Sequence, residues 1–283
     1  MSDPLSVLAA LSVPRTGHVF ELAEIRTPGM PMPELHPQLV VLPFRTPRGL
    51  LRDDEHRWPG GEDNVKDIAF TSDYVTMTTH TGTHVDALGH ISRGVPPRWR
   101  GGDELGHVGD FGLTAGGAGE LGPILGRGVL LDIPRVTGRP HLAAGEGVDA
   151  ALLQRAIDQQ ELELRAGDIA LIRTGMGALR PDRTLMRDAD GAGLTSSGAE
   201  LLLELGIAAI GSDTEAVEQQ PSTTPGNPHP VHELLLLEHG VPMIELLQLE
   251  ELAAEGSREF LFIAGPVKIA GATAGLTDPI AIT

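Results

Sequence analysis

The chain has 283 residues, of which 41% are apolar and 21% are charged, and its formal net charge is −18. This balance is typical of a globular protein and excludes a chain that is mainly disordered, collagen-like or coiled coil. The excess of acidic residues excludes the basic surface that binding to nucleic acid or to anionic lipid requires. Cysteine is absent, which excludes disulfides, thiolate metal ligands and a cysteine nucleophile.

Segments that would direct the chain to or across a membrane are not evident in the sequence. No uninterrupted apolar run approaches the ~20 residues that a membrane-spanning helix needs. The first eleven residues are partly apolar but carry Asp3 and no preceding basic residue, unlike a signal peptide. We therefore expect a soluble, cytoplasmic protein that acts on a small molecule, without a nucleic-acid or membrane partner.

The first half of the chain reads as strands and loops. Residues 1–35 are rich in proline and polar residues and predict an N-terminal arm. Segments 38–42 and 68–79 predict strands, the second ending at His80, because β-branched residues are frequent there. Turn-forming residues over 45–64, and the many glycines of 92–126, predict loops.

The second half alternates strands with helices, which favours a mixed α/β domain over 36–283. Apolar residues at helical spacing predict one helix over 149–162. Ser197 and Glu200 form a capping-box pattern at the start of a second helix, which Gly206 ends. A third helix is expected over 229–239. The expected strands are 129–133, 168–173, 207–210, 241–244, 260–263 and 280–282.

Chemistry-bearing residues concentrate in one short run, which contains His80, His84, Asp86 and His90. The pattern H-x-x-x-H-x-D supplies two imidazoles and a carboxylate, the ligands of a divalent metal that prefers nitrogen and oxygen. Gly82 allows the backbone to turn so that side chains on both sides converge. Spacing alone leaves zinc, manganese and iron open.

His90 follows Asp86 by four positions and has a different expected role. If residues 86–90 begin a helix, the two side chains lie on one face. His90 would then stand close to the metal without binding it, which is the position of a general base. The alternatives are a fourth ligand and a core histidine bonded to the backbone.

A second pair, His232 and Glu245, is separated by thirteen residues. A helix followed by a returning strand brings the two ends of such a segment to one rim of the sheet. Glu245 follows an apolar strand, so its buried charge needs a partner. We expect the pair at the same site as His80; a salt bridge from Glu245 to an arginine is the alternative.

The run from His80 to His90 resembles the H-x-G-T-H-x-D-x-P-x-H motif of the cyclase family of metal-dependent hydrolases. That family includes bacterial kynurenine formamidases and isatin hydrolases. Leu88 stands where the family has proline, so the chain resembles the Asp-Ala-Leu-x-His branch. Four further stretches are similar to the family: 167–175, 211–218, 230–245 and 262–271.

The resemblance implies a swivelling β/β/α fold, with a mixed sheet and flanking helices, and a homo-dimer or homo-tetramer. It implies metal ligation by His80, His84 and Asp86, with His90 as the catalytic histidine. It also implies that His232 and Glu245 complete a second metal site. The expected cofactor is a divalent ion, Zn or Mn, with one or two ions per chain.

The sequence thus predicts a metal-dependent hydrolase of a C–N bond in an amide or cyclic amide. A lactone hydrolase, or a cyclase or dehydratase of natural-product synthesis, would use the same residues, and a non-catalytic metal-binding protein is the third reading. Arg57 could orient a substrate carboxylate, and Trp58 and Phe70 could wall an aromatic pocket. Each of these three residues has a plain structural alternative, on a solvated loop or in the core.

Overall fold

The computed structural model describes residues 4–32, 36–52, 68–101, 107–180 and 191–283. The chain divides into two compact units. Arg26–Thr81 forms one, here called the hairpin unit, and Met1–Ile25 with Gly82–Thr283 forms the other, the sheet unit. The predicted boundary between an arm over 1–35 and a domain over 36–283 stays a prediction.

The hairpin unit contains an antiparallel ribbon of β2 (Val40–Arg45) and β3 (Ser72–Thr76), with the helix α2 (Pro47–Arg52) after β2. The register shifts between Pro43 and Arg45, which is consistent with the missing N–H of proline. The helix lies where sequence patterns predicted only a loop. Every residue of β2 is exposed, so the apolar side chains of this strand are not packed in a core of their own.

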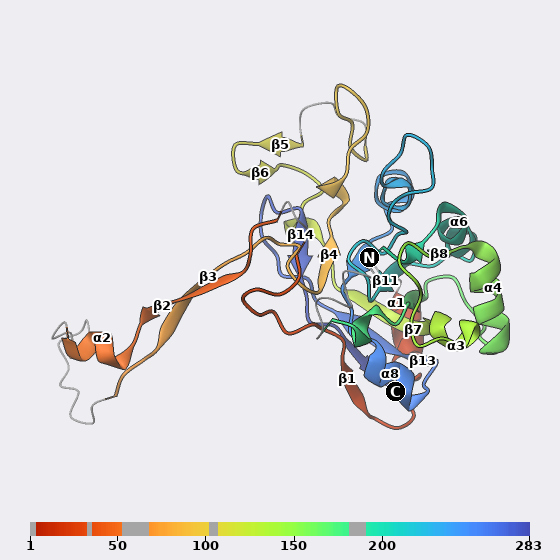
Figure 1. Ribbon diagram of the computed structural model, residues 1–283, viewed down its shortest axis with the longest axis horizontal. Helices are drawn as coiled ribbons and strands as arrows, with labels where there is room; N and C mark the ends of the chain where they lie inside the picture. The colour runs from red at the N-terminus through yellow and green to blue at the C-terminus, as the bar shows by residue number, and fades with distance from the viewer. Residues whose placement is uncertain (1–3, 33–35, 53–67, 102–106, 181–190) are drawn as a thin grey trace. The chain divides into compact units, whose positions relative to one another are not determined.

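The described residues of the sheet unit form a nine-stranded mixed sheet in the order β1-β15-β13-β7-β9-β11-β12-β4-β14 (Figure 1). The four central strands β7, β9, β11 and β12 run parallel, and every other pair within this nine-stranded sheet is antiparallel. The strand bounds are β1 Val19–Glu21, β4 His84–Asp86, β7 Ile124–Asp132, β9 Ile169–Arg173, β11 Ala209–Ser212, β12 Met243–Glu245, β13 Glu259–Ala264, β14 Ala274–Leu276 and β15 Ile280–Ile282.

Each face of this sheet carries an apolar core, because side chains alternate along a strand. On β7, Val129 and Leu131 enter one cluster while Leu130 enters the other. On β9, Ile172 enters the same cluster as Val129, and Leu171 enters the same cluster as Leu130. Strands covered on both faces read as continuous apolar runs, which is why the sequence showed them as short buried strands.

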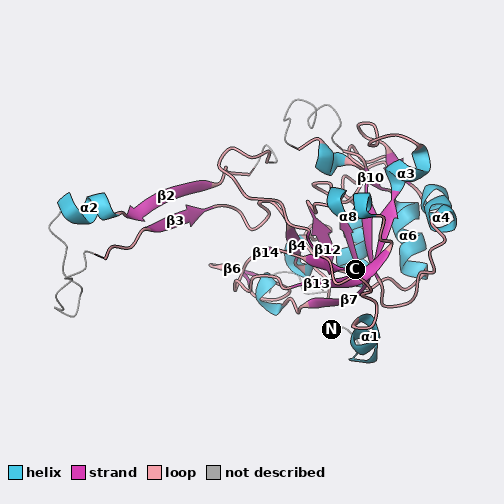
Figure 2. Cartoon of the chain, turned by 90° about the horizontal axis from the view of Figure 1, so that it is seen from below, coloured by secondary structure: helices cyan, strands magenta, loops and turns pink. Residues whose placement is uncertain are grey.

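Helices α3 (Ile133–Thr137), α4 (Ala150–Gln159) and α6 (Ser196–Glu204) lie together beside the sheet in Figure 2. Leu153 of α4 and Leu202 of α6 are buried in the core on this face. Leu252 of α8 (Glu250–Glu255) belongs to the opposite core. Asp149 caps α4 by accepting a hydrogen bond from the Leu152 N–H at 2.8 Å.

Shorter elements complete the described structure. They are α1 Pro4–Ala10, η1 Leu88–His90, β5 Val108–Gly109, β6 Gly112–Leu113, η2 Ala118–Glu120, β8 Gly147–Val148, η3 Met176–Ala178, β10 Gly193–Leu194, α7 Pro230–His232 and η4 Glu233–His239. None of the helices in the described ranges combines the length and the apolar character needed to span a membrane.

The predicted fold class is confirmed: the protein is a mixed α/β structure with a large curled sheet and flanking helices. One helix start was predicted wrongly: Thr195, not Ser197, caps α6, because its hydroxyl accepts the Gly198 N–H. The helix expected over 229–239 is present, as one turn of α-helix followed by a π-helix. Within 1–35, β1 pairs with β15 at the sheet edge, a long-range contact that local composition does not encode.

Candidate functional site

Two antiparallel strands, β4 and β12, bring together residues from distant parts of the sequence. The motif histidine His84 opens β4, and Glu245 ends β12. The strand register places these two residues directly opposite each other. The short helix η1 follows the motif, as expected, but His84 and Asp86 themselves belong to the sheet, which the sequence did not predict. His232 ends α7, at the start of the π-helix that leads back to β12.

His84, Asp86, His232 and Glu245, here called the buried cluster, form a closed arrangement of alternating imidazoles and carboxylates. His84 Nε2 lies 3.3 Å from Asp86 Oδ1 and 3.3 Å from Glu245 Oε2. His232 Nε2 lies 3.5 Å from Asp86 Oδ2 and 3.4 Å from Glu245 Oε1. Each carboxylate thus presents one oxygen to each ring. All four residues are buried.

The electrostatics of the buried cluster favour positive charge between the carboxylates. Burial lowers the pKa of His84, but Asp86 and Glu245 outweigh it and raise that pKa to about 10. The pKa of His232 is likewise raised well above its usual value, against burial, by its carboxylate neighbours. Burial and Asp86 raise the pKa of Glu245, yet the two imidazoles leave it below its ordinary value. Protons on the two rings therefore hold the place that a divalent cation can take.

The donor set fits a divalent metal. Imidazole nitrogen and carboxylate oxygen are ligands of Zn²⁺ and Mn²⁺, and no thiol competes in this chain. His84 Nδ1 lies 2.8 Å from the Gly82 carbonyl. A hydrogen bond from Nδ1–H to that carbonyl points Nε2 toward the cluster, where a metal would replace the Nε2 proton; metal-binding histidines are usually oriented by such a bond.

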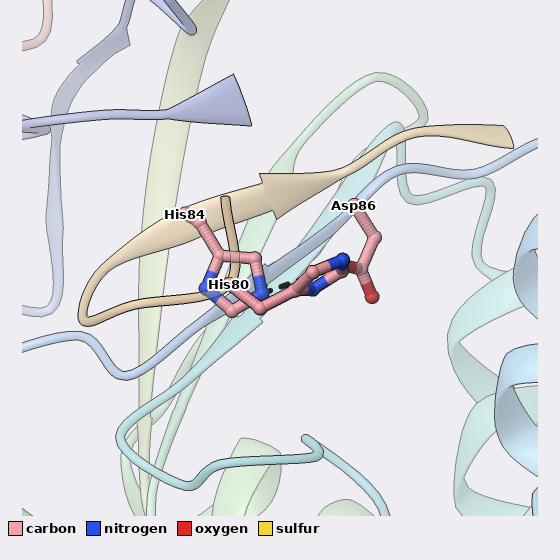
Figure 3. Close-up of side chains that lie close together, drawn as sticks. All are labelled: His80, His84 and Asp86. Carbon is pink, nitrogen blue, oxygen red and sulfur yellow. Dashed lines mark ion pairs between the residues drawn. The ribbon is translucent and has the colours of Figure 1, made fainter. Parts of the chain in front are cut away.

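His80 lies four residues before His84 and is half-buried. One ligand atom from each of His80, His84 and Asp86 falls within 4.8 Å of the others. Figure 3 shows the three side chains together, with His84 and Asp86 drawn as an ion pair. The role of His80, His84 and Asp86 as metal ligands stays a prediction.

His90 ends the short helix η1 and is exposed, unlike the buried cluster. The ligand atoms of Asp86, His90 and His232 lie within 4.8 Å of one another, and the His90 and His232 ring centroids are 6.1 Å apart. The expected shared helix face with Asp86 was wrong, because Asp86 belongs to a strand. A water-accessible ring beside buried carboxylates suits a general base.

Three residues were predicted to contact the substrate: Arg57, Trp58 and Phe70. Arg57 and Trp58 lie outside the described residues. Phe70 belongs to the hairpin unit and its side chain is exposed, so its proposed place in a pocket wall stays a prediction.

Sequence reasoning did not single out Glu218, which touches the buried cluster. Its Oε1 lies 2.5 Å from His232 Nδ1 and 2.9 Å from His229 Nδ1. Glu218 is fully enclosed, with 1% of its side chain exposed. The available signal was weak: the residue ends the stretch 211–218, which resembles the cyclase family but carries no metal-ligand spacing.

The sheet and the buried cluster together define an α/β protein with an imidazole–carboxylate centre suited to a divalent metal. A model of the Cyclase family matches residues 11–219. The chain therefore belongs to the Cyclase family, as its motif indicated. Among curated proteins, no significant match to this chain was found.

Solved structures agree with this assignment. A crystal structure described as a novel cyclase has a TM-score of 0.85 and 29% identity, over 99% of this chain and 92% of its own. Isatin hydrolase A from Labrenzia aggregata, bound to benzyl benzoate, has a TM-score of 0.68 and 18% identity over 98% and 96%. An isatin hydrolase bound to the product analogue thioisatinate has a TM-score of 0.67 and 19% identity over 94% and 92%. These two isatin hydrolases establish a shared fold.

Proposed function

We propose that this protein is a metal-dependent hydrolase of a C–N bond in an amide or cyclic amide. The observation that carries this proposal is the convergence of two histidines and two carboxylates in one buried cluster, beside the exposed His90. Isatin hydrolases share the fold. This similarity supports a cyclic amide as the first substrate class to test.

His80, His84 and Asp86 would hold the primary ion, and His232 with Glu245 would form a second position or support the first. The donor set suits Zn or Mn, with one or two ions per chain. A divalent ion in such a site supplies Lewis-acid chemistry, since it polarises a carbonyl and lowers the pKa of water toward ~7. The protein contributes the enclosed carboxylates that fix the charge of the centre and the backbone bond that orients His84.

His90 is proposed as the general base. A ring nitrogen of His90 would take a proton from the attacking water and return it to the leaving nitrogen, because the ring is both solvent-accessible and close to Asp86. The same position could instead serve a fourth ligand. A His90→Ala variant separates these two roles, because only a ligand would change the metal content.

A second function is favoured by the descriptions of two matched structures. One is a novel cyclase and another a potential metal-dependent hydrolase with cyclase activity. A lactone hydrolase, or a cyclase or dehydratase, would use the same residues with the ion polarising a different carbonyl. A panel of formamide, cyclic imide, isatin-type and lactone substrates, assayed with the metal-loaded protein, discriminates these functions. Turnover of lactones alone would contradict the proposed C–N specificity.

We also propose a homo-oligomer, a dimer or tetramer. Large apolar side chains are exposed on the hairpin unit, among them Phe44 at 74% and Tyr74 at 61%. Exposed apolar residues on a ribbon with no core of its own are typical of surfaces that associate. Light scattering after size exclusion should give a mass of two or four chains. A Phe44→Ser, Tyr74→Ser double variant should shift that mass toward one chain. A wild-type protein with the mass of a single chain would refute the oligomer.

A further inference from the structure

We propose that Glu218 is a positioning residue that orients His232, so that the Nε2 atom of this ring faces the carboxylates of Asp86 and Glu245. The inference rests on the proposed function in one respect, the assignment of His232 to the metal centre. The two nitrogens of the ring are divided between different partners. Nδ1 lies 2.5 Å from Glu218 Oε1, and Nε2 lies within 3.5 Å of Asp86 and Glu245.

This division would fix the tautomer of His232 once a metal is bound. A carboxylate accepts a hydrogen bond and cannot donate one, so the Nδ1 atom facing Glu218 carries a proton. In the metal-free protein Nε2 carries a proton as well, toward Asp86 and Glu245. A metal at the centre would replace that second proton, while Glu218 would keep the one on Nδ1 and so leave the Nε2 lone pair for the metal. Burial raises the pKa of Glu218, but His229, His232 and the backbone bond from Val231 outweigh it and hold that pKa below its usual value.

Both oxygens of Glu218 are engaged on the segment that carries His232. Oε2 accepts the backbone N–H of Val231 at 2.9 Å, and Oε1 lies 2.9 Å from His229 Nδ1. The carboxylate therefore holds the ring and the backbone beside it at the same time. His229 itself is half exposed and contacts neither Asp86 nor Glu245 in the described structure, so the link to the centre runs through His232.

The backbone at Glu218 is built to aim this side chain inward. Val217 has a φ of 57°, a left-handed conformation that is a rare outlier for a β-branched residue. The Glu218 N–H bonds to the Ala216 carbonyl across it, which closes a three-residue turn. Strained residues persist only where the surroundings over-determine them, and they concentrate at functional sites.

The strand β10 supplies that restraint. Leu194 N donates to the Val217 carbonyl at 2.8 Å, and Gln219 N donates to the Leu194 carbonyl at 2.9 Å. A Cβ on Gly193 would lie 2.5 Å from the Glu218 carbonyl carbon and 2.5 Å from Val217 O. Only glycine permits this close approach. The hydrogen bonds and the close packing of β10 together restrain the turn that carries Glu218.

The experiment compares metal binding by metal-free Glu218→Gln, His232→Ala and His84→Ala proteins with the wild type, using Zn²⁺ or Mn²⁺ alone without substrate. Glu218→Gln keeps the size of the side chain but loses its charge. Asp168→Asn is the matched control, because Asp168 is also a buried acid, paired with Arg127 on the sheet. Circular dichroism and urea melts establish that each variant is folded.

We expect Glu218→Gln to weaken metal binding roughly 10- to 100-fold, as loss of a carboxylate bonded to a metal-binding histidine does, and Asp168→Asn to bind like the wild type. In ¹⁵N spectra of the metal-loaded protein, the Nδ1–H signal of His232 should shift or broaden in Glu218→Gln. Metal binding equal to the Asp168→Asn control, while His232→Ala binds weakly, would overturn the role of Glu218 and leave the proposed function standing. Unchanged metal binding in His232→Ala would also overturn the role of Glu218, because His232 would then not belong to the metal centre. Full metal binding in His84→Ala would refute the proposed metal centre itself.

Discussion

His84 and Glu245 face each other across the antiparallel strands β4 and β12, with His84 Nε2 3.3 Å from Glu245 Oε2. One partner belongs to the H-x-x-x-H-x-D motif, and the other is the last residue of a strand near the C-terminus. The strand register thus joins a local motif to a distant carboxylate. His232 completes the arrangement from α7, so three separate segments contribute to one buried centre.

Substitution of a motif residue should remove the metal. Because His84 and Asp86 supply both nitrogen and oxygen ligands in the proposed site, His84→Ala or Asp86→Ala should lose the ion and all measurable hydrolysis. Elemental analysis of the purified proteins measures the ion per chain. His18→Ala is the control, since the side chain of His18 is 69% exposed and the residue precedes β1, which lies at the opposite edge of the sheet from β4 and β14. A full complement of metal in His84→Ala contradicts the assignment.

His90→Ala should separate catalysis from metal binding. The variant should retain its ion and lose rate by roughly 10²–10⁴-fold, the usual contribution of a general base. The rate should be measured by kcat/KM over a range of pH, where the limb due to this base should disappear. Loss of the ion from His90→Ala would place His90 among the ligands instead.

The metal-free protein should lose stability as the pH rises above neutrality. Burial lowers the pKa of His84, but its carboxylate neighbours raise the folded-state value to about 10, above the ordinary 6.5. The stabilisation from the protonated ring is therefore fully present below about 6.5 and disappears as the pH rises through about 10. Urea midpoints in the presence of a chelator, taken at several pH values in this window, measure the loss.

His84→Gln provides the comparison for that titration. It removes the ionisable ring while the carboxylates of Asp86 and Glu245 remain, so its urea midpoint should fall less steeply over the same pH window. Equal slopes in the wild type and His84→Gln would show that another group is responsible.

Gly193→Ala should destabilise the protein and disturb the centre. The added Cβ would meet the backbone of Val217 and Glu218 at 2.5 Å, and such overpacking costs about 1–3 kcal/mol. Displacement of Glu218 should also weaken metal binding. Gly122→Ala is the control because nothing lies within 4 Å of its added Cβ, and its effect should stay within about 0.5 kcal/mol. Equal free energies of unfolding in the two variants would contradict the close approach.

Features that depend on neighbouring residues could be predicted from the sequence. The run from His80 to His90 indicated the metal chemistry and the family, because its ligands are only a few positions apart. Helix α4 followed from apolar spacing and its cap Asp149, and the central parallel strands followed from short apolar runs. Alternation of these elements was sufficient to predict the α/β class.

Long-range contacts set which distant residues join the motif and how they are held. The place of Glu245 opposite His84 depends on the pairing of β12 with β4, and the pairing of β1 with β15 is equally non-local. The π-helix after His232 and the left-handed turn before Glu218 are conformations that intrinsic propensity disfavours. Packing against β10 and the sheet over-determines these segments, and that energy arises from contacts far apart in the chain.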